Sequence, residues 1–213
     1  MTVQDIINFC QQQVQEVYDN PTWIRFINAA LDDLTPVAKM LRSKDNVAVT
    51  VVNGKATITL SSDEDLAKLH EAIAVYYTPQ GGSQEQLARI PWTDNVSKGW
   101  KRDAVSIVIQ GVSGNSGTVK VDYYKKLDHV SSTSNTPELP DQYHNLLILY
   151  VCAKSQQREE ELNDKNDFYS EYLLAKQAFA LDRIYEMEPH NRKLIRRARI
   201  AAMIGAGGSG GGA

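Results

Sequence analysis

The chain has no apolar run long enough to cross a membrane and only two cysteines among its 213 residues. Its longest apolar run is Leu146–Ala153, whereas a helix that spans a bilayer needs about 20 such residues. Two cysteines exclude a disulfide-rich secreted scaffold, and Cys10 and Cys152 both fall in apolar helical patterns, where we expect buried thiols. The first residues lack the cationic segment of a signal peptide. We therefore expect a protein that is made in the cytoplasm and does not associate with membranes.

The motifs of common catalytic and metal sites are also missing. The four histidines have no metal-ligand spacing, and neither CxxC nor HxxxH occurs. Three glycines in Gly111–Gly117 are spaced as in phosphate loops, but this segment joins two predicted strands and lacks the Gly-Lys-Ser/Thr ending. No Gly-x-Ser-x-Gly turn between a strand and a helix frames a nucleophile. We therefore expect no enzyme activity, no metal site and no cofactor.

Acidic residues are absent from the C-terminal end. After Glu188 the sequence contains five Lys or Arg residues and no Asp or Glu. Since the net charge of the chain is −3, the part up to Glu188 carries a net charge of −8. Such a division indicates a specific partner for the C-terminal segment rather than a uniformly charged surface.

Two helices are predicted at the N-terminus. The pattern Thr2-x-x-Asp5 resembles a capping box in front of apolar residues at helical spacing, which predicts a helix to about residue 18. Asn20-Pro21 then begins a second helix, whose apolar residues continue to Leu41. We expect Pro36 to kink this helix or to break it in two.

The middle of the chain is rich in strand signals. Asn53-Gly54 separates two β-branched runs, Val47–Val52 and Lys55–Leu60, which predicts a hairpin because both turn residues must take positive φ. Glu71–Thr78 is a further strand candidate, although residues 66–74 could equally be helical.

A second strand pair is predicted nearer the C-terminus. Ala104–Gln110 and Thr118–Lys125 flank the glycine-containing segment described above. Residues 79–100, with glycines, prolines and two tryptophans, are typical of loops.

Two further helices follow the strands. The apolar run Leu146–Ala153 has no polar face, so it is expected at the centre of a bundle. The next helix, 164–188, carries apolar residues on three stripes, more than one bundle face can use. We favour a second subunit that covers part of it; the alternative is a helix central to its own subunit. The candidate subunit-interface residues are Phe168, Tyr172, Phe179, Leu181 and Tyr185.

These elements predict an α+β fold that is mainly α, a bundle of about five helices with a β-rich insertion and an extended C-terminal tail. The bundle would comprise residues 1–45 and 131–189, and the insertion residues 46–130. Residues 190–213 would form a short basic helix and a Gly-rich tail.

The pattern of the chain resembles the head–tail adaptor (connector) proteins of tailed bacteriophages. The matching features are a Val-x-Val-x-Tyr-Tyr strand, a Pro-x-Leu-Pro-x-x-Tyr-His junction, an apolar helix, and a long helix with Phe and Tyr. They lie at Val119–Tyr124, Pro137–His144, Leu146–Ala153 and Phe168–Tyr172, and Trp23–Leu31 is similar to the second helix of that family. The resemblance extends from residue 1 to about residue 190.

This resemblance implies a structural protein of the virion. It would form a homo-oligomeric ring, with twelve copies, below the portal protein and would join the portal to a neck or tail protein. DNA would pass through the ring without specific binding. The C-terminal segment would bind the portal, because arginine pairs bidentately with carboxylates. The candidate portal-binding residues are Arg192, Lys193, Leu194, Arg196, Arg197, Arg199, Ile200, Met203 and Ile204.

A DNA-binding accessory protein that uses the same basic segment is the main alternative. Arginines gathered along one segment are typical of nucleic-acid contacts. However, no aromatic residue is interleaved with them to stack on bases.

Overall fold

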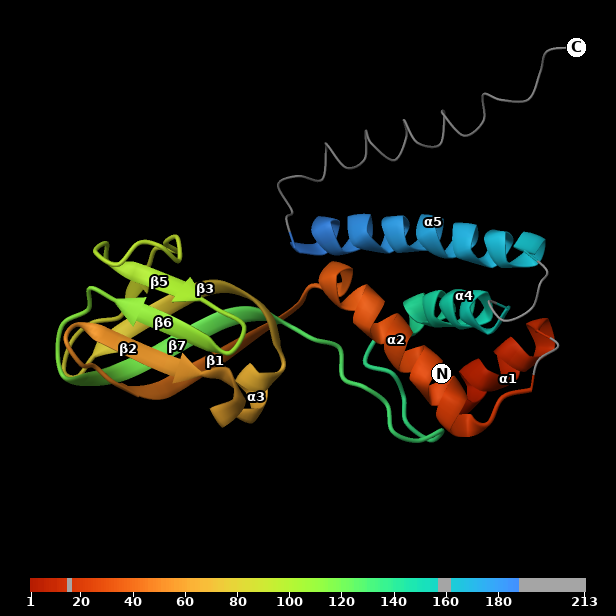
Figure 1. The fold of residues 1–213 in the computed structure, drawn as a ribbon, viewed down its shortest axis with the longest axis horizontal. Coiled ribbons are helices and arrows are strands. Elements are labelled where there is room, and N and C mark those ends of the chain that lie inside the picture. The colour runs from red at the N-terminus through yellow and green to blue at the C-terminus, as the bar shows by residue number, and fades with distance from the viewer. Residues whose placement is uncertain (15–16, 157–161, 188–213) are drawn as a thin grey trace, which may run out of the picture. The chain divides into compact units, whose positions relative to one another are not determined.

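The computed structural model describes residues 1–14, 17–156 and 162–187 (Figure 1). The chain divides into two compact units. A helical unit contains Met1–Ala38 and the described residues from Asp128 onward, and a β unit contains Lys39–Leu127. The helical unit is built from α1 (Val3–Gln13), α2 (Asn20–Ala38), the 3-10 turn η2 (Asp141–Tyr143), α4 (His144–Ser155) and α5 (Leu162–Met187).

The first helix begins as the sequence predicts. The Thr2 hydroxyl accepts a hydrogen bond from the Asp5 backbone, and the Asp5 carboxylate accepts one from the Thr2 backbone, so the capping box is confirmed. The side chains of Val3, Ile6, Ile7 and Cys10 are buried at helical spacing along one face. This face places the Cys10 thiol in the core of the unit.

Helix α2 is continuous through Pro36, so of the two predicted effects, a kink or a break, the break does not occur. Pro36 lies in the last turn, so its missing N–H and its steric effect come where the helix is about to end. The helix stops at Ala38 rather than Leu41, because Lys39 takes a positive φ of 45° and the next residue begins a strand.

Helix α4 occupies the centre of the helical unit, as its apolar sequence predicts. It packs against α1, α2 and α5. Leu147, Val151 and Cys152 have no exposed surface. His144, at its first residue, is also fully buried and its Nε2 lies 2.6 Å from the Leu139 carbonyl oxygen.

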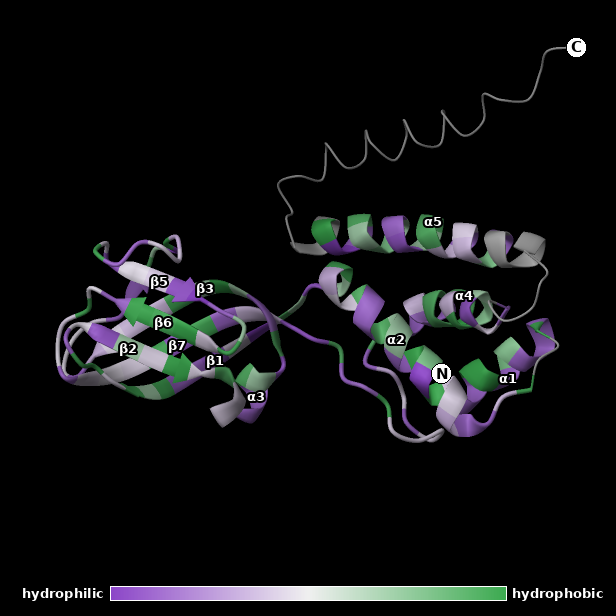
Figure 2. Ribbon diagram, in the orientation of Figure 1, coloured by the Kyte–Doolittle hydropathy of each residue, from purple (hydrophilic) through white to green (hydrophobic). Residues whose placement is uncertain are grey.

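The β unit contains two antiparallel sheets. One sheet has the strand order β1-β7-β3-β4, and the other has the order β2-β6-β5. Residues from both sheets form a single apolar core, and the central strand β6 is hydrophobic over most of its length in Figure 2. The elements are β1 (Met40–Thr50), β2 (Lys55–Thr59), η1 (Leu60–Ser62), α3 (Glu64–Ala67), β3 (Leu69–Pro79), β4 (Glu85–Leu87), β5 (Gly99–Arg102), β6 (Ser106–Gln110) and β7 (Ser116–Lys125).

Both predicted strand pairs are wrong, although the predicted turn is present. Asn53 and Gly54 have φ values of 52° and 72°, and Val52 and Lys55 exchange backbone hydrogen bonds across them. Beyond this single bridge the chain passes from one sheet to the other: β1 pairs with β7, and β2 pairs with β6. Strands β6 and β7 likewise belong to different sheets.

The prediction of a mainly helical fold is also wrong. The described residues form five helices and seven strands, and α3, with four residues, belongs to the β unit. Residues 79–100 contribute β4 and the start of β5 instead of a plain loop. The protein is therefore a β-rich α+β fold whose strands make up a unit of their own.

A substitution in the Asn53-Gly54 turn tests whether the β unit can be destabilised without affecting the helical unit. In Gly54→Val, a β-branched residue must take a positive φ, which costs about 1–3 kcal/mol. An added Cβ meets only the Val112 oxygen at 3.5 Å, so the cost is conformational rather than steric. We expect faster hydrogen exchange in β2 and β6 and unchanged exchange in α4. Gly54→Asn is the control, because asparagine tolerates this φ; equal loss of protection in α4 would contradict the prediction.

Candidate interaction surfaces

The part of the chain that the structure describes holds no group of three or more His, Cys, Asp or Glu side chains that could bind a metal ion. A search of the same residues finds no helix with both the length and the apolar character needed to cross a membrane.

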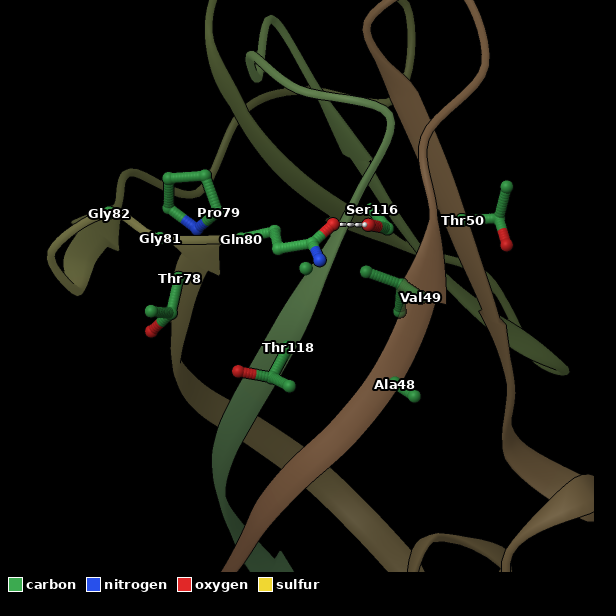
Figure 3. Close-up of a pocket in the computed structure, with 11 residues that line it drawn as sticks. Ala48, Val49, Thr50, Thr78, Pro79, Gln80, Gly81, Gly82, Ser116 and Thr118 are labelled. Atoms are coloured by element: carbon green, nitrogen blue, oxygen red, sulfur yellow. Dashed lines mark hydrogen bonds between the residues drawn. The ribbon is translucent and has the colours of Figure 1, made fainter.

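A hollow lies at the end of the β unit where β1, β7 and β3 run side by side (Figure 3). Its volume is about 570 Å³. Small and hydroxyl-bearing residues line it, and the Ser116 hydroxyl donates a hydrogen bond of 2.8 Å to Gln80 Oε1. None of its lining residues is charged, so the hollow offers neither an acid–base pair nor a counter-ion for a charged ligand.

One face of α5 packs against the rest of the helical unit. Tyr172 and Phe179 are each 1 % exposed. The centroid of the Tyr172 ring lies 5.2 Å from the centroid of the Tyr150 ring on α4. The centroids of the Phe179 and Tyr143 rings are 4.4 Å apart. The stripe that contains both residues is therefore the contact between α5 and its own unit.

The same face of α5 also forms hydrogen bonds with α2. The Tyr172 hydroxyl donates a hydrogen bond to Asp33, and Lys176 Nζ lies 2.7 Å from Asp33 Oδ2. Burial alone would raise the pKa of Asp33, but the hydrogen bonds from Lys176 and Tyr172 outweigh it and keep the pKa below its ordinary value. Burial, together with the adjacent Asp33 carboxylate, raises the pKa of Tyr172. Near the other end, Arg183 Nε donates to the Ala38 carbonyl at 2.8 Å.

Outside the buried stripe, α5 presents large apolar side chains to solvent. Tyr169 is 46 %, Leu173 41 % and Leu174 68 % exposed. We call these three residues the exposed α5 face. Isolated apolar residues on a surface are ordinary, but a group on one helix is typical of a contact surface.

The predicted interface residues differ in how exposed their side chains are in the structure. Tyr172 and Phe179 are buried within their own unit, whereas Phe168 and Leu181 are partly exposed. The side chain of Tyr185 and all nine candidate portal-binding residues, from Arg192 to Ile204, lie outside the described residues. The exposed α5 face belongs to the other two stripes of the same helix, and only the three-stripe pattern pointed to it.

Sequence reasoning did not find an ordered loop in the β unit. Two buried side chains bind the loop of residues 91–98 through hydrogen bonds. Lys101 Nζ donates to two backbone carbonyls of the loop and to one Asn side chain. Gln110 Nε2 donates to two backbone carbonyls of the same loop. Within the loop, hydrogen bonds from Ser97 and from the Val96 N–H lower the pKa of Asp94 to about 2. The loop holds Trp92 half-exposed, and tryptophan is enriched in protein-binding surfaces. Lys101 falls between the predicted loop 79–100 and the predicted strand Ala104–Gln110, so no local pattern marked it.

Comparison with known proteins identifies a family for this chain. The chain is similar to a chain of a solved structure described as the neck of a native GTA particle computed with C12 symmetry. The two are 16 % identical with a TM-score of 0.26, and the match covers 80 % of this chain and 88 % of that chain. No curated protein sequence matches. The family model for the SU10 adaptor protein matches residues 1–198, which includes all the described residues of both units. The chain therefore belongs to the SU10 adaptor protein family, which confirms the resemblance to bacteriophage adaptor proteins.

Proposed function

We propose that this protein is a structural head–tail adaptor that assembles into a ring below the portal of a tailed bacteriophage and joins the portal to a neck or tail protein. The family match over residues 1–198 is the observation that carries the proposal. The copy number of twelve comes from the resemblance of the sequence to the adaptor proteins. Its mechanism is binding, without a chemical step.

Neighbouring subunits contact one another through α5 in this proposal. The exposed α5 face supplies apolar area that its own unit leaves uncovered. Phe168 and Leu181, which are partly exposed, lie on the same helix and contribute at its edges. Tyr172 and Phe179 support the contact indirectly, because they fix α5 on the helical unit. A ring requires a heterologous contact, in which this face meets a different surface of the next subunit.

The C-terminal segment binds the portal in this proposal, and the remainder of the chain lines the path of the DNA. Five positive charges follow Glu188, and the preceding part carries a net charge of −8. Negative charge repels the phosphate backbone, so an acidic wall lets DNA pass without binding it. The arginines, in contrast, suit an acidic or carbonyl-rich protein surface.

Deletion of residues 190–213 tests this assignment. We expect the shortened protein to fold, to keep the helical content of α1, α2, α4 and α5, and to lose binding to purified portal rings in cosedimentation. A second deletion, of residues 205–213 alone, removes the glycines of this segment and keeps all five cations. Portal binding by this variant would show that the charged part is sufficient for the contact.

Two outcomes would contradict the proposal. Unchanged portal binding after the long deletion would place the contact elsewhere in the protein. Tight binding of duplex DNA that falls steeply with salt and disappears with residues 190–213 would favour the DNA-binding alternative, because counterion release gives this signature.

A further inference from the structure

The exposed large apolar side chains in the described part of the helical unit fall into two groups. Phe9 on α1 is 48 % exposed, and Val17, in the segment between α1 and α2, is 87 % exposed. The second group is the exposed α5 face. Helix α4 lies between α1 and α5 and packs against both (Figure 1). The two groups therefore belong to helices on different sides of α4.

Phe9 lies outside the buried stripe of α1, among side chains that carry no charge. Gln12 and Gln13, one turn further along the helix, are exposed. We call Phe9, Gln12 and Gln13 the α1 face. Helix α1 itself contains one carboxylate, that of Asp5, which accepts hydrogen bonds from the Thr2 backbone and hydroxyl. The α1 face thus has an apolar centre with carboxamides beside it.

The middle of the exposed α5 face is also uncharged. On a helix with 3.6 residues per turn, Ser170 lies between Leu173 and Leu174, and it is exposed. Two exposed carboxylates, those of Asp167 and Glu171, lie on the side of Leu174 that faces away from Leu173. An uncharged centre with charge at its rim is the usual composition of a protein–protein interface.

We propose that the exposed α5 face of one subunit docks on the α1 face of the next, so that the partner is a second copy of this chain. The inference rests on the proposed function, which requires a ring and does not say which surface α5 meets. A ring needs two different contact surfaces on every subunit. Helices α1 and α5 supply these two surfaces within one helical unit.

Charge favours this pairing over a contact between two α5 helices. The chain up to Glu188 carries a net charge of −8, so two copies repel each other except where uncharged surfaces meet. Contact between two α5 faces would bring Asp167 and Glu171 of both copies to the same rim, and juxtaposed like charges are costly. The α1 face instead offers Gln12 and Gln13, whose carboxamides can donate hydrogen bonds to those carboxylates.

Two full-length variants, each blocked on one face, test the proposal. Leu174→Asp blocks the exposed α5 face and keeps the α1 face, and Phe9→Asp does the reverse. Each variant alone should remain monomeric in sedimentation velocity at high micromolar concentration. An equal mixture should form a dimer, because the intact α5 face of Phe9→Asp meets the intact α1 face of Leu174→Asp. Circular dichroism checks that both variants are folded.

Crosslinking tests the same contact without blocking it, so it does not depend on how Phe9→Asp folds. The double variant Gln12→Cys/Ser170→Cys places one thiol beside each face. With a bifunctional maleimide, it should give a ladder of covalent oligomers in a denaturing gel. Neither single variant should give a ladder, because each carries a thiol beside only one face and the native Cys10 and Cys152 are buried.

The outcomes separate a failure of this inference from a failure of the proposed function. A dimer of Phe9→Asp alone, or a crosslinked dimer of Ser170→Cys alone, would show that two α5 faces meet and would overturn the inference. Rings of the wild type without a ladder from the double variant would also overturn it, because α5 would then meet another surface. A wild type that forms no ring, either alone or with purified portal rings, would contradict the proposed function and the inference with it.

Discussion

Tyr172→Asp is expected to unfold the helical unit rather than to act at a subunit contact. Tyr172 is 1 % exposed and packs on the Tyr150 ring. An aspartate there would lose these contacts and would place a second carboxylate beside Asp33, which now accepts the Tyr172 hydrogen bond. An uncompensated buried charge costs about 3–5 kcal/mol, a large share of the ~5–15 kcal/mol by which proteins of this size are stable.

Hydrogen exchange followed by mass spectrometry measures this effect separately in each unit. Protection should be lost in α2, α4 and α5 and kept in β6 and β7. Tyr172→Phe is the matched control, since it keeps the ring and removes only the hydroxyl; Lys176 still pairs with Asp33, so a loss of only about 1 kcal/mol is expected. Wild-type protection in the aspartate variant would show that Tyr172 does not hold α5 in place.

The elements that local patterns define could be predicted from the sequence. The capping box at Thr2 and the buried character of α4 depend on residues close together in the chain, and both predictions are confirmed. The same holds for the Asn53-Gly54 turn, because two adjacent residues determine its positive φ values.

The arrangement of the strands could not be predicted in this way. The Asn53-Gly54 turn determines where the chain reverses, but the strands on either side find partners far away, β7 for β1 and β6 for β2. Strand β4 has only three residues and is recognisable only through its pairing with β3. Residues 79–100 therefore read as a loop, and the β content of the fold was underestimated.

The candidate subunit interface could also be predicted only in part. Helical periodicity identifies which residues of α5 share a face, but it does not say which face meets α2 and α4. Two of the five interface candidates, Tyr172 and Phe179, are in fact the most deeply buried of the α5 side chains that the structure describes. Asp33, on another helix, binds Tyr172 and Lys176 of the buried face, and no local pattern identifies that pairing.

Leu174→Asp is expected to prevent ring formation and to leave the subunit folded. Leu174 is 68 % exposed, so a charge at this position stays in water in the isolated subunit and changes its stability by less than about 0.5 kcal/mol. In a ring built through the exposed α5 face, the same charge would be buried without a partner, which costs about 3–5 kcal/mol at every contact.

Mass photometry gives the assembly state of this variant, and thermal unfolding monitors its fold. Val105→Asp is the matched control, because Val105 is 64 % exposed but lies in the β unit. If α5 forms the contact, Leu174→Asp remains monomeric with a wild-type Tm, while Val105→Asp assembles normally. Normal rings of Leu174→Asp would exclude the exposed α5 face, and loss of rings in both variants would mean that added negative charge, rather than this face, controls assembly. The contrast with Tyr172→Asp then separates the two sides of α5: a change on one side unfolds the subunit, and a change on the other leaves it folded but unable to join its neighbour.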